Sequence, residues 1–446
     1  MKIKSKDIII FITIFILIFF INYFLVSLTT DEIQGYGYSL NIANGMIPYK
    51  DFGMVTLPFY ALFHSIILLI NNSFLFFYLI CTLYSTTIFY LFYKKVGLIK
   101  TLFLILLFVL FEGYFYNTFI MILMLGIILL LVSNNKYKDL LIGLLIGSIM
   151  MIKVSIGACL FLVFFFTSKN KLRAFLYSAI IPFIILIYLL CTNSLIDCIN
   201  YCILGAKNFK NNIAIDPLFL IRFIIAISYI IYKLIKTKDK NYYYLLAFGI
   251  ICYPIVDFGH VFIYLLIIFS YLMLTLKEKN NIILLKILIV VILISNYNFD
   301  FSFKHLNNYF IGYKNFSSNY QADKYKRYVL NNKDKRMFIM VGWSYLIKIE
   351  TGLPIDKYDI IYRGNMGKDD LLYLSEIDEI CNKEDCRILV EFPEYDKSYS
   401  QFLPEYKDYI LSNYELCYSD FVYCKNKDDE KNYFCPLESG GTYEKE

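Results

Sequence analysis

The residues of this chain best suited to chemistry are charged side chains beside long apolar segments. Asp31 and Glu32 directly follow the first apolar segment, and Asp51 stands further along the same polar stretch. Carboxylates accept protons, stabilise positive charge and ligate divalent cations. Two explanations compete: the acids form a site, or they complement a helix N-terminus and an exposed loop.

A second group of ionisable residues lies deeper in the apolar sequence. Lys153 separates two apolar arms, and such a residue is a functional hypothesis by default, although a lysine can also reach the membrane interface. Asp257 and His260 share one face if a helix runs through both. Arg222 lies about one turn into an apolar segment, where a structural ion pair is an equal explanation. Glu112 is a weaker candidate.

The composition identifies the kind of protein that positions these groups. Of 446 residues, 59% are hydrophobic and 18% are charged, and the mean hydropathy is +0.56. A soluble domain has roughly 45–50% apolar and about 25% charged residues, so an integral membrane protein is expected. The net charge of +6 comes from short lysine clusters between apolar segments. That placement is typical of cytoplasmic loops, and the clusters are too short and dispersed for a nucleic-acid surface.

Eleven apolar segments are long enough to be candidate membrane spans. The first exceeds a signal-peptide core and lacks a following cleavage motif, so we expect it to remain as a span. Segment 57–71 is either a twelfth span or partly interfacial; eleven spans place the lysine clusters on the cytoplasmic side, and a twelfth would break that agreement. The eleven segments are 8–28, 74–93, 98–111, 117–132, 139–152, 154–167, 174–191, 218–235, 242–258, 261–276 and 283–299.

The chain from about residue 300 differs from the preceding part. Short apolar runs alternate with charged, helix-compatible segments, which predicts a small α/β domain. Because the chain changes sides with each of the eleven spans, this domain is expected on the extracytoplasmic side of the membrane. Outside, one or two disulfides are expected among its five cysteines, with one left over: Cys381, Cys386, Cys417, Cys424 and Cys435.

In the polar stretch after the first span, apolar residues recur every three or four positions, the spacing of a helix. Gly45 and Pro48 can end this helix, with Asp31 and Glu32 at its start and Asp51 just beyond its end. The pattern predicts an amphipathic helix in the plane of the interface, folded so that both ends meet at one outward cleft. The spacing is carried by Ile33, Tyr36, Leu40, Ala43 and Ile47.

The stretch "TTDEIQGYGYSLNIANGMIPYKDFGMVTLPFYALF" resembles the first outer loop of the GT-C glycosyltransferases. These polytopic membrane enzymes use polyprenyl-phosphate sugars; protein O-mannosyltransferases and lipid A aminoarabinose transferases are examples. The resemblance implies a transmembrane catalytic domain over residues 1–299, with its first outer loop at 29–56, and an extracytoplasmic α/β domain over 300–446. The motif residues are Asp31, Glu32, Gly45, Pro48, Tyr49, Asp51 and Pro58.

The resemblance also implies catalytic roles for the acids. Asp31 takes the place of the general base that removes the acceptor's proton, with Glu32 as the alternative. A carboxylate there could also stabilise the oxocarbenium-like transition state. Asp51 takes the place of the second acid, which orients a substrate or helps Asp31 hold a metal. A divalent cation is compatible with this set but is not required by it.

The donor phosphate would be held by cations from the apolar part. Lys153, followed by Gly157, is similar to a lysine–glycine element of the family, and "YPIVDFGH" is similar to a Pro-x-x-Asp-x-x-His element. There His260 would donate to phosphate or acceptor while Asp257 fixes its tautomer. Many relatives carry arginine after the proline where this chain has Ile255, which weakens that role. Arg222 is a further candidate phosphate ligand.

The expected activity is transfer of a sugar to a cell-surface glycan, a lipid-linked glycan or a protein. It would take place at the outer face of a bacterial cell membrane, in cell-envelope or polysaccharide biosynthesis, with the N-terminus cytoplasmic. The alternatives are a lipid-linked glycan transporter or flippase, and a polysaccharide polymerase or ligase. The sequence has no internal repeat that would favour a transporter and no large outer loop rich in Arg and His that would favour a polymerase. It also has no phosphate-binding Gly-rich loop that would indicate an ATP-driven pump.

Overall fold

The structure is a computed structural model, and its described residues form two compact units. The first unit holds those between 5 and 203 and between 215 and 275, and the second holds those from 322 to 425. The described ranges are 5–25, 30–54, 56–109, 113–204, 215–253, 255–275, 322–340, 344–354, 370–390, 404–418 and 422–425.

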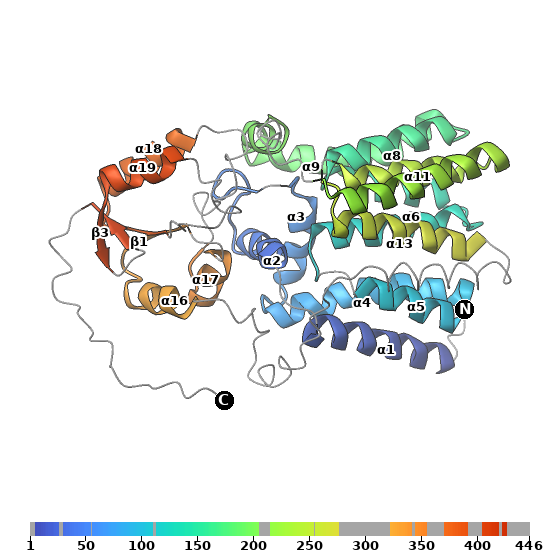
Figure 1. Ribbon diagram of the computed structural model, residues 1–446, viewed down its shortest axis with the longest axis horizontal. Helices are drawn as coiled ribbons and strands as arrows, with labels where there is room; N and C mark the ends of the chain where they lie inside the picture. Colours follow the sequence, from blue (N-terminus) through green and yellow to red (C-terminus); the bar gives the residue numbers. More distant parts are fainter. Residues whose placement is uncertain are drawn as a thin grey trace. The chain divides into compact units, whose positions relative to one another are not determined.

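The first unit is helical. Its longer helices run side by side, with the short α2 and α3 at one end of them (Figure 1). The elements are α1 (Ser5–Phe20), a π-helix (Ile21–Leu25), α2 (Thr30–Ala43), α3 (Phe59–Leu68), α4 (Phe74–Val96), α5 (Leu98–Val109), α6 (Tyr116–Leu131), α7 (Lys138–Met150), α8 (Val154–Thr167), α9 (Lys171–Cys191), α10 (Leu195–Cys198), a π-helix (Ile199–Leu204), α11 (Pro217–Thr237), α12 (Asn241–Phe248), a 3-10 turn (Gly249–Cys252) and α13 (Phe258–Thr275).

The apolar segments predicted up to residue 276 coincide with these helices, which confirms a helical chain rich in apolar segments. Four of the described helical segments are long and apolar enough to cross a membrane: Ser5–Phe24, Phe74–Val96, Lys171–Cys191 and Pro217–Thr237. The remaining apolar helices are shorter, and α3 in the ambiguous segment 57–71 has 10 residues. The predicted span 283–299 lies outside the described residues. The number of crossings therefore stays a prediction.

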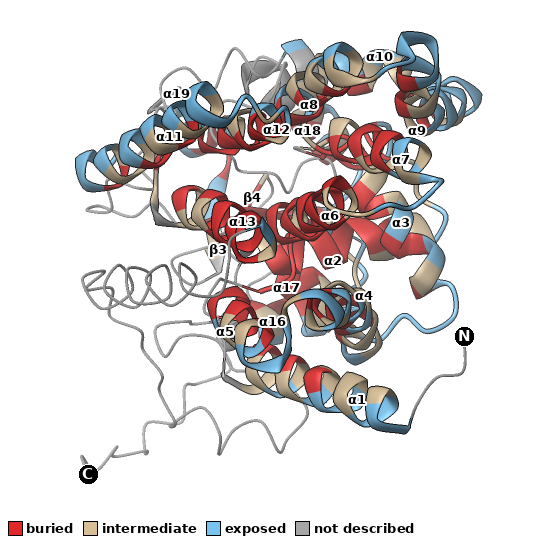
Figure 2. Ribbon diagram, turned by 90° about the vertical axis from the view of Figure 1, so that its right-hand side faces the viewer, coloured by how far each residue is buried: buried red, intermediate tan, exposed pale blue. Residues whose placement is uncertain are grey.

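Helix α6 lies at the centre of the first unit. Almost all its side chains from Asn117 to Leu131 are buried, whereas α9 and α11 expose many apolar side chains (Figure 2). A helix that is apolar on every side is stable only when other helices surround it. The exposed apolar faces of α9 and α11 are those expected of helices that contact lipid.

Glycines allow the hairpin of α7 and α8 to close tightly. A Cβ on Gly157 of α8 would lie 2.2 Å from the Met150 Cα atom, and one on Gly143 of α7 would lie 2.5 Å from the Tyr177 Cβ atom of α9. Small residues at such crossings let helices pack by van der Waals contact where no hydrophobic driving force acts. The hairpin tip carries Lys153.

Connections far apart in the sequence meet at each end of the first unit. At one end the Tyr271 hydroxyl donates to Asp239 at 2.8 Å, and Thr167 and Tyr244 share a hydrogen bond of 3.1 Å. This end contains the lysine-rich loops after α8 and α11. At the other end, backbone N–H groups of the chain before α3 donate to carbonyls of the α7–α8 tip: Leu57 to Ile152 and Phe59 to Met151. The Asp216 N–H there donates to Val256.

The second unit is a four-stranded sheet with helices. Strands β1 and β2 are parallel, and β4 and β3 extend the sheet antiparallel in the order β1-β2-β4-β3. This confirms a small C-terminal sheet. Its elements are α16 (Ala322–Asn331), β1 (Arg336–Met340), α17 (Ser344–Thr351), α18 (Asp370–Cys381), β2 (Cys386–Val390), α19 (Pro404–Asn413), β3 (Glu415–Tyr418) and β4 (Val422–Cys424).

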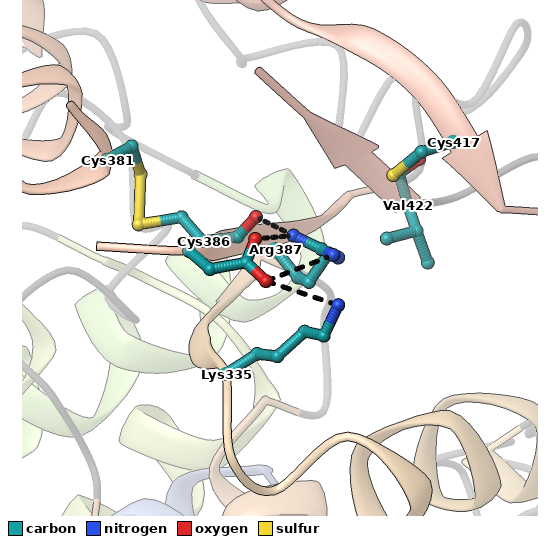
Figure 3. Close-up of polar contacts among 7 residues, drawn as sticks. Lys335, Cys381, Cys386, Arg387, Cys417 and Val422 are labelled. Carbon is teal, nitrogen blue, oxygen red and sulfur yellow. Dashed lines mark hydrogen bonds and ion pairs between the residues drawn. A yellow bond between two sulfur atoms is a disulfide. The ribbon is translucent and has the colours of Figure 1, made fainter. Parts of the chain in front are cut away.

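A disulfide and an ion-pair group lie where β2 begins. Cys381 at the end of α18 is bonded to Cys386, and Asp385 between them contacts the buried Arg387 and Lys335 (Figure 3). One of the expected disulfides is therefore present. Cys417 lies in β3, Cys424 lies in β4, and Cys435 lies outside the described residues.

Candidate functional site

Helix α2 forms where the sequence predicts it, but its surroundings differ from the prediction. The sequence predicts an amphipathic helix in the plane of the membrane interface, with its apolar residues on one face. Instead, residues 32–39 are all buried, the polar Glu32, Gln34 and Ser39 included, and Ile47 lies beyond the helix. The surface-helix prediction is wrong because neighbouring helices, α3 above all, cover the polar side as well. Asp31, in the first turn, is partly exposed.

The loop after α2 is stabilised by its own hydrogen bonds. Gly45 adopts a φ of 89°, a conformation that favours glycine, as the chain leaves the helix. Asp51 is exposed, and its Oδ2 atom accepts the Ile47 N–H at 2.7 Å. Its charge also acts on Tyr188 of α9. Asp51 thus stabilises the loop turn, and the contacts of the described residues do not bring it to Asp31.

Asp257 and His260 form one hydrogen-bonded pair at the start of α13. Asp257 Oδ1 accepts the His260 backbone N–H at 2.9 Å and lies 2.8 Å from His260 Nδ1. The carboxylate can only accept, so Nδ1 carries the proton and Nε2 is left to bind or exchange another. The side chain of Asp257 is 48% exposed and that of His260 is 13% exposed. The predicted tautomer-fixing contact is therefore present.

Asp31 lies within electrostatic reach of this pair. Burial raises the pKa of the Asp31 carboxyl above its ordinary value, and the nearby His260 opposes the shift. For Asp257, burial alone would raise the pKa, but hydrogen bonds and charge from His260, together with Lys153, outweigh burial, and the pKa lies below its ordinary value. The two acids are thus biased in opposite directions, an arrangement that often separates the proton-handling roles of a site.

Lys153 joins the same group of charges from the α7–α8 tip. Burial lowers the pKa of its ammonium to about 8, while the neighbouring Cys252 and Asp257 oppose that shift. Asp31, Lys153, Asp257 and His260 are henceforth called the Asp257 cluster. Its members come from α2, the hairpin tip and the start of α13. A cation, an imidazole and two carboxylates together can bind an anion and move a proton.

The remaining predicted site residues have other contacts or lie outside the described residues. Glu32 is turned into the interior, where its Oε1 atom accepts the Tyr114 N–H at 2.9 Å. Arg222 lies with its guanidinium 4.9 Å from the centre of the Phe219 ring on its own helix. Glu112 lies outside the described residues. Within the described part of the chain, no group of three or more His, Cys, Asp or Glu is placed to hold a metal ion.

The sequence patterns did not reveal two features that shape the site. Cys252 lies beside Lys153, and Gly113 lies against the Glu32 carboxylate. A cysteine among apolar residues carries no signal of its own, since it most often serves as a small apolar side chain. A glycine beside an aromatic run marks a close approach only when its neighbour in space is known.

Comparison of the chain with protein-family models, with curated proteins and with solved structures gave no match. The case for its function therefore rests on its own residues, on the resemblance of its first outer loop and on the geometry of the Asp257 cluster.

Proposed function

We propose that this protein is a membrane glycosyltransferase that moves a sugar from a polyprenyl-phosphate donor to an acceptor hydroxyl. The acceptor oxygen attacks the anomeric carbon as Asp31 takes its proton. The bond from that carbon to the phosphate oxygen breaks, and polyprenyl phosphate leaves with the electron pair. The acceptor is a surface glycan, a lipid-linked glycan or a protein.

The observation that carries this proposal is the convergence in the Asp257 cluster. Residues separated by more than two hundred positions in the sequence meet at one end of the helical unit, and they are those that the GT-C resemblance selects. The choice of Asp31 over Glu32 is supported by their surroundings. Asp31 is partly exposed and lies within electrostatic reach of His260, while Glu32 is 0% exposed and accepts a backbone hydrogen bond.

Lys153 and His260 are suited to the donor phosphate. A charged ammonium donates to phosphate oxygens, and so does His260 Nε2 when the imidazole is in its protonated form; charge-assisted hydrogen bonds are the stronger kind. Burial of Lys153 strengthens its attraction to an anion because less water screens the charge. The cluster could therefore stabilise the leaving phosphate while Asp31 acts on the acceptor.

A bacterial cell-membrane location with eleven spans fits this proposal. The lysine-rich loops after α8 and α11 lie at one end of the helical unit and the Asp257 cluster lies at the other, as expected if the site faces outward. The Cys381–Cys386 disulfide supports an extracytoplasmic second unit, because disulfides persist in oxidising compartments. On this view the GT-C-like part is followed by an outer α/β domain that contacts the acceptor.

Replacement of Asp31 by asparagine tests the proposal directly. Purified protein in nanodiscs is given a panel of polyprenyl-phosphate sugars and surface-glycan acceptors, and product is measured by mass spectrometry. Loss of a general base lowers turnover by about 10²–10⁴-fold. We expect Asp31→Asn to show this loss with an unchanged melting temperature. Near-normal turnover would rule out Asp31 as the base, and a wild-type protein inactive with every donor would reject the proposed function.

A further inference from the structure

Glu32 links α2 to the chain segment that precedes α6. Its side chain is 0% exposed, and Oε1 accepts the Tyr114 N–H at 2.9 Å. The Tyr114 carbonyl in turn accepts a hydrogen bond of 3.2 Å from the Tyr60 hydroxyl of α3. Both backbone polar groups of Tyr114 are therefore bonded to side chains, one from α2 and one from α3. This arrangement fixes three segments against one another.

Gly113 makes the approach of the carboxylate possible. A Cβ atom at this position would lie 2.2 Å from Glu32 Oε2 and 2.4 Å from Glu32 Cδ. An added methyl group would have to displace the carboxylate, and the carboxylate cannot move without lengthening its bond to the Tyr114 N–H. Gly113 is thus required for the contact itself, independently of any need for a special backbone conformation.

The direction of Glu32 determines the direction of Asp31. Successive side chains on an α-helix point about 100° apart, because the helix has about 3.6 residues per turn. The contact of Glu32 with Tyr114 restrains the rotation of α2, and with it the direction in which Asp31 leaves the helix within electrostatic reach of His260. Both acids lie in the first turn of α2, where a helix end would otherwise fray.

We propose that Glu32 is a positioning residue, which anchors the first turn of α2 to Gly113–Tyr114 and so holds Asp31 in the Asp257 cluster. The effect of this role on catalysis rests on the proposed function, whereas the anchoring contact itself does not depend on it. A misplacement of about 1 Å costs on the order of a hundredfold in rate. Loss of the anchor therefore lowers turnover without any change in the residues that contact substrate.

Four single variants and one double variant of the full chain in nanodiscs test the anchor. Glu32→Ala removes the acceptor, Glu32→Gln keeps an acceptor oxygen without the charge, and Gly113→Ala displaces the carboxylate. Gly126→Ala is the control, because a Cβ there would meet only the movable side-chain ends of Leu145 at 3.3 Å and Ile88 at 3.7 Å. Each variant is measured for amide hydrogen exchange at Tyr114 and through α2, for melting temperature, for turnover and for donor affinity.

We expect faster exchange at Tyr114 and through α2 in Glu32→Ala and Gly113→Ala, with turnover lowered by about a hundredfold. Donor affinity should stay close to that of the wild type, because Lys153 is untouched. Glu32→Gln should recover most of the protection and most of the turnover. Addition of Gly113→Ala to Glu32→Ala should cause little further change, because the two substitutions disrupt one contact.

Each other result overturns a defined part of the proposal. Unchanged exchange in Glu32→Ala disproves the anchor, whatever the protein catalyses. Faster exchange with normal turnover disproves the positioning role. Loss of turnover in Glu32→Gln with normal exchange makes Glu32 a proton-transferring group instead. If exchange becomes faster in Glu32→Ala and Gly113→Ala as expected but the protein transfers no sugar, the anchor is supported and the proposed function is rejected.

Discussion

Two regions of the first unit contain the same kinds of residue and use them differently. The Asp257 cluster pairs an acid and a histidine with a lysine at partly exposed helix ends. The other region, called here the Glu32 core, also contains an acid and a histidine, but both are 0% exposed and surrounded by aromatic rings. It comprises Glu32, Tyr60, His64, Cys81 and Tyr114.

The difference between the regions lies in what each side chain can still do. In the Glu32 core, His64 Nδ1 lies 2.8 Å from the Tyr60 carbonyl and Nε2 lies 3.7 Å from Cys81 Sγ, so both ring nitrogens have neighbours. In the Asp257 cluster, His260 has one nitrogen fixed and a half-exposed partner. The comparison teaches that residue type alone does not define a site; solvent access and unused donors do.

The largest expected difference is in stability between the two histidines. His64→Ala leaves a cavity among closely packed rings and should lower the free energy of unfolding by about 2–5 kcal/mol. His260→Ala should lower it much less and reduce turnover instead. Thermal unfolding in nanodiscs measures both, and His64→Phe is the control that refills the cavity. Equal destabilisation by the two alanine variants would break the comparison.

Replacement of Lys153 gives the next largest effect, on donor affinity. Lys153→Met keeps the length of the side chain and removes its charge, and a hydrogen bond to a charged group contributes about 1.5–3 kcal/mol, roughly tenfold to a hundredfold in affinity. Calorimetric titration with polyprenyl phosphate measures the change. Arg222→Met is the matched control, because Arg222 stacks on Phe219 and should contribute little. Equal losses in both variants would place Arg222 in the phosphate site.

Neutralisation of Asp257 should have a smaller effect. Asp257→Asn keeps an oxygen for the His260 N–H groups but removes the charge that favours the imidazolium, so a loss of about 0.5–1.5 kcal/mol in transition-state stabilisation is expected. The pH–rate profile should change shape as well, since the ionised Asp257 carboxylate no longer lies beside the His260 ring. An unchanged profile would show that the pair is structural, as the Glu32 core is.

The pH dependence of the wild-type protein tests the roles of Lys153 and Asp31 in the Asp257 cluster without any substitution. Lys153 binds phosphate only when protonated, so donor affinity should fall as pH rises through about 8, the pKa to which burial lowers the ammonium. Asp31 acts as a base only when ionised, so turnover should fall as pH decreases through its raised pKa. Donor affinity and turnover measured from acid to alkaline pH test both of these dependences. Lys153→Met should abolish the fall in donor affinity at alkaline pH. If the fall persists in this variant, a group other than Lys153 causes it.

Much of the architecture could be predicted from local sequence. Long apolar runs specify helices, and alternating short segments specify the small sheet, because hydrophobic periodicity and turn residues act over neighbouring positions. The start of α2 at the Asp31–Glu32 pair was predictable for the same reason. The burial of both faces of α2 was not, since it depends on packing against α3 and on the contact of Glu32 with Tyr114, which is far away in the sequence.

The sequence by itself determined which residues were available for chemistry and roughly where each lay along a helix. The tertiary structure alone decided that Asp31 lies within electrostatic reach of His260 while its neighbour Glu32 turns to Tyr114, and that Asp51 bonds within its own loop. The physical reason is that helix rotation and helix packing are set by long-range contacts such as Gly113 against Glu32. No local pattern encodes contacts of that kind.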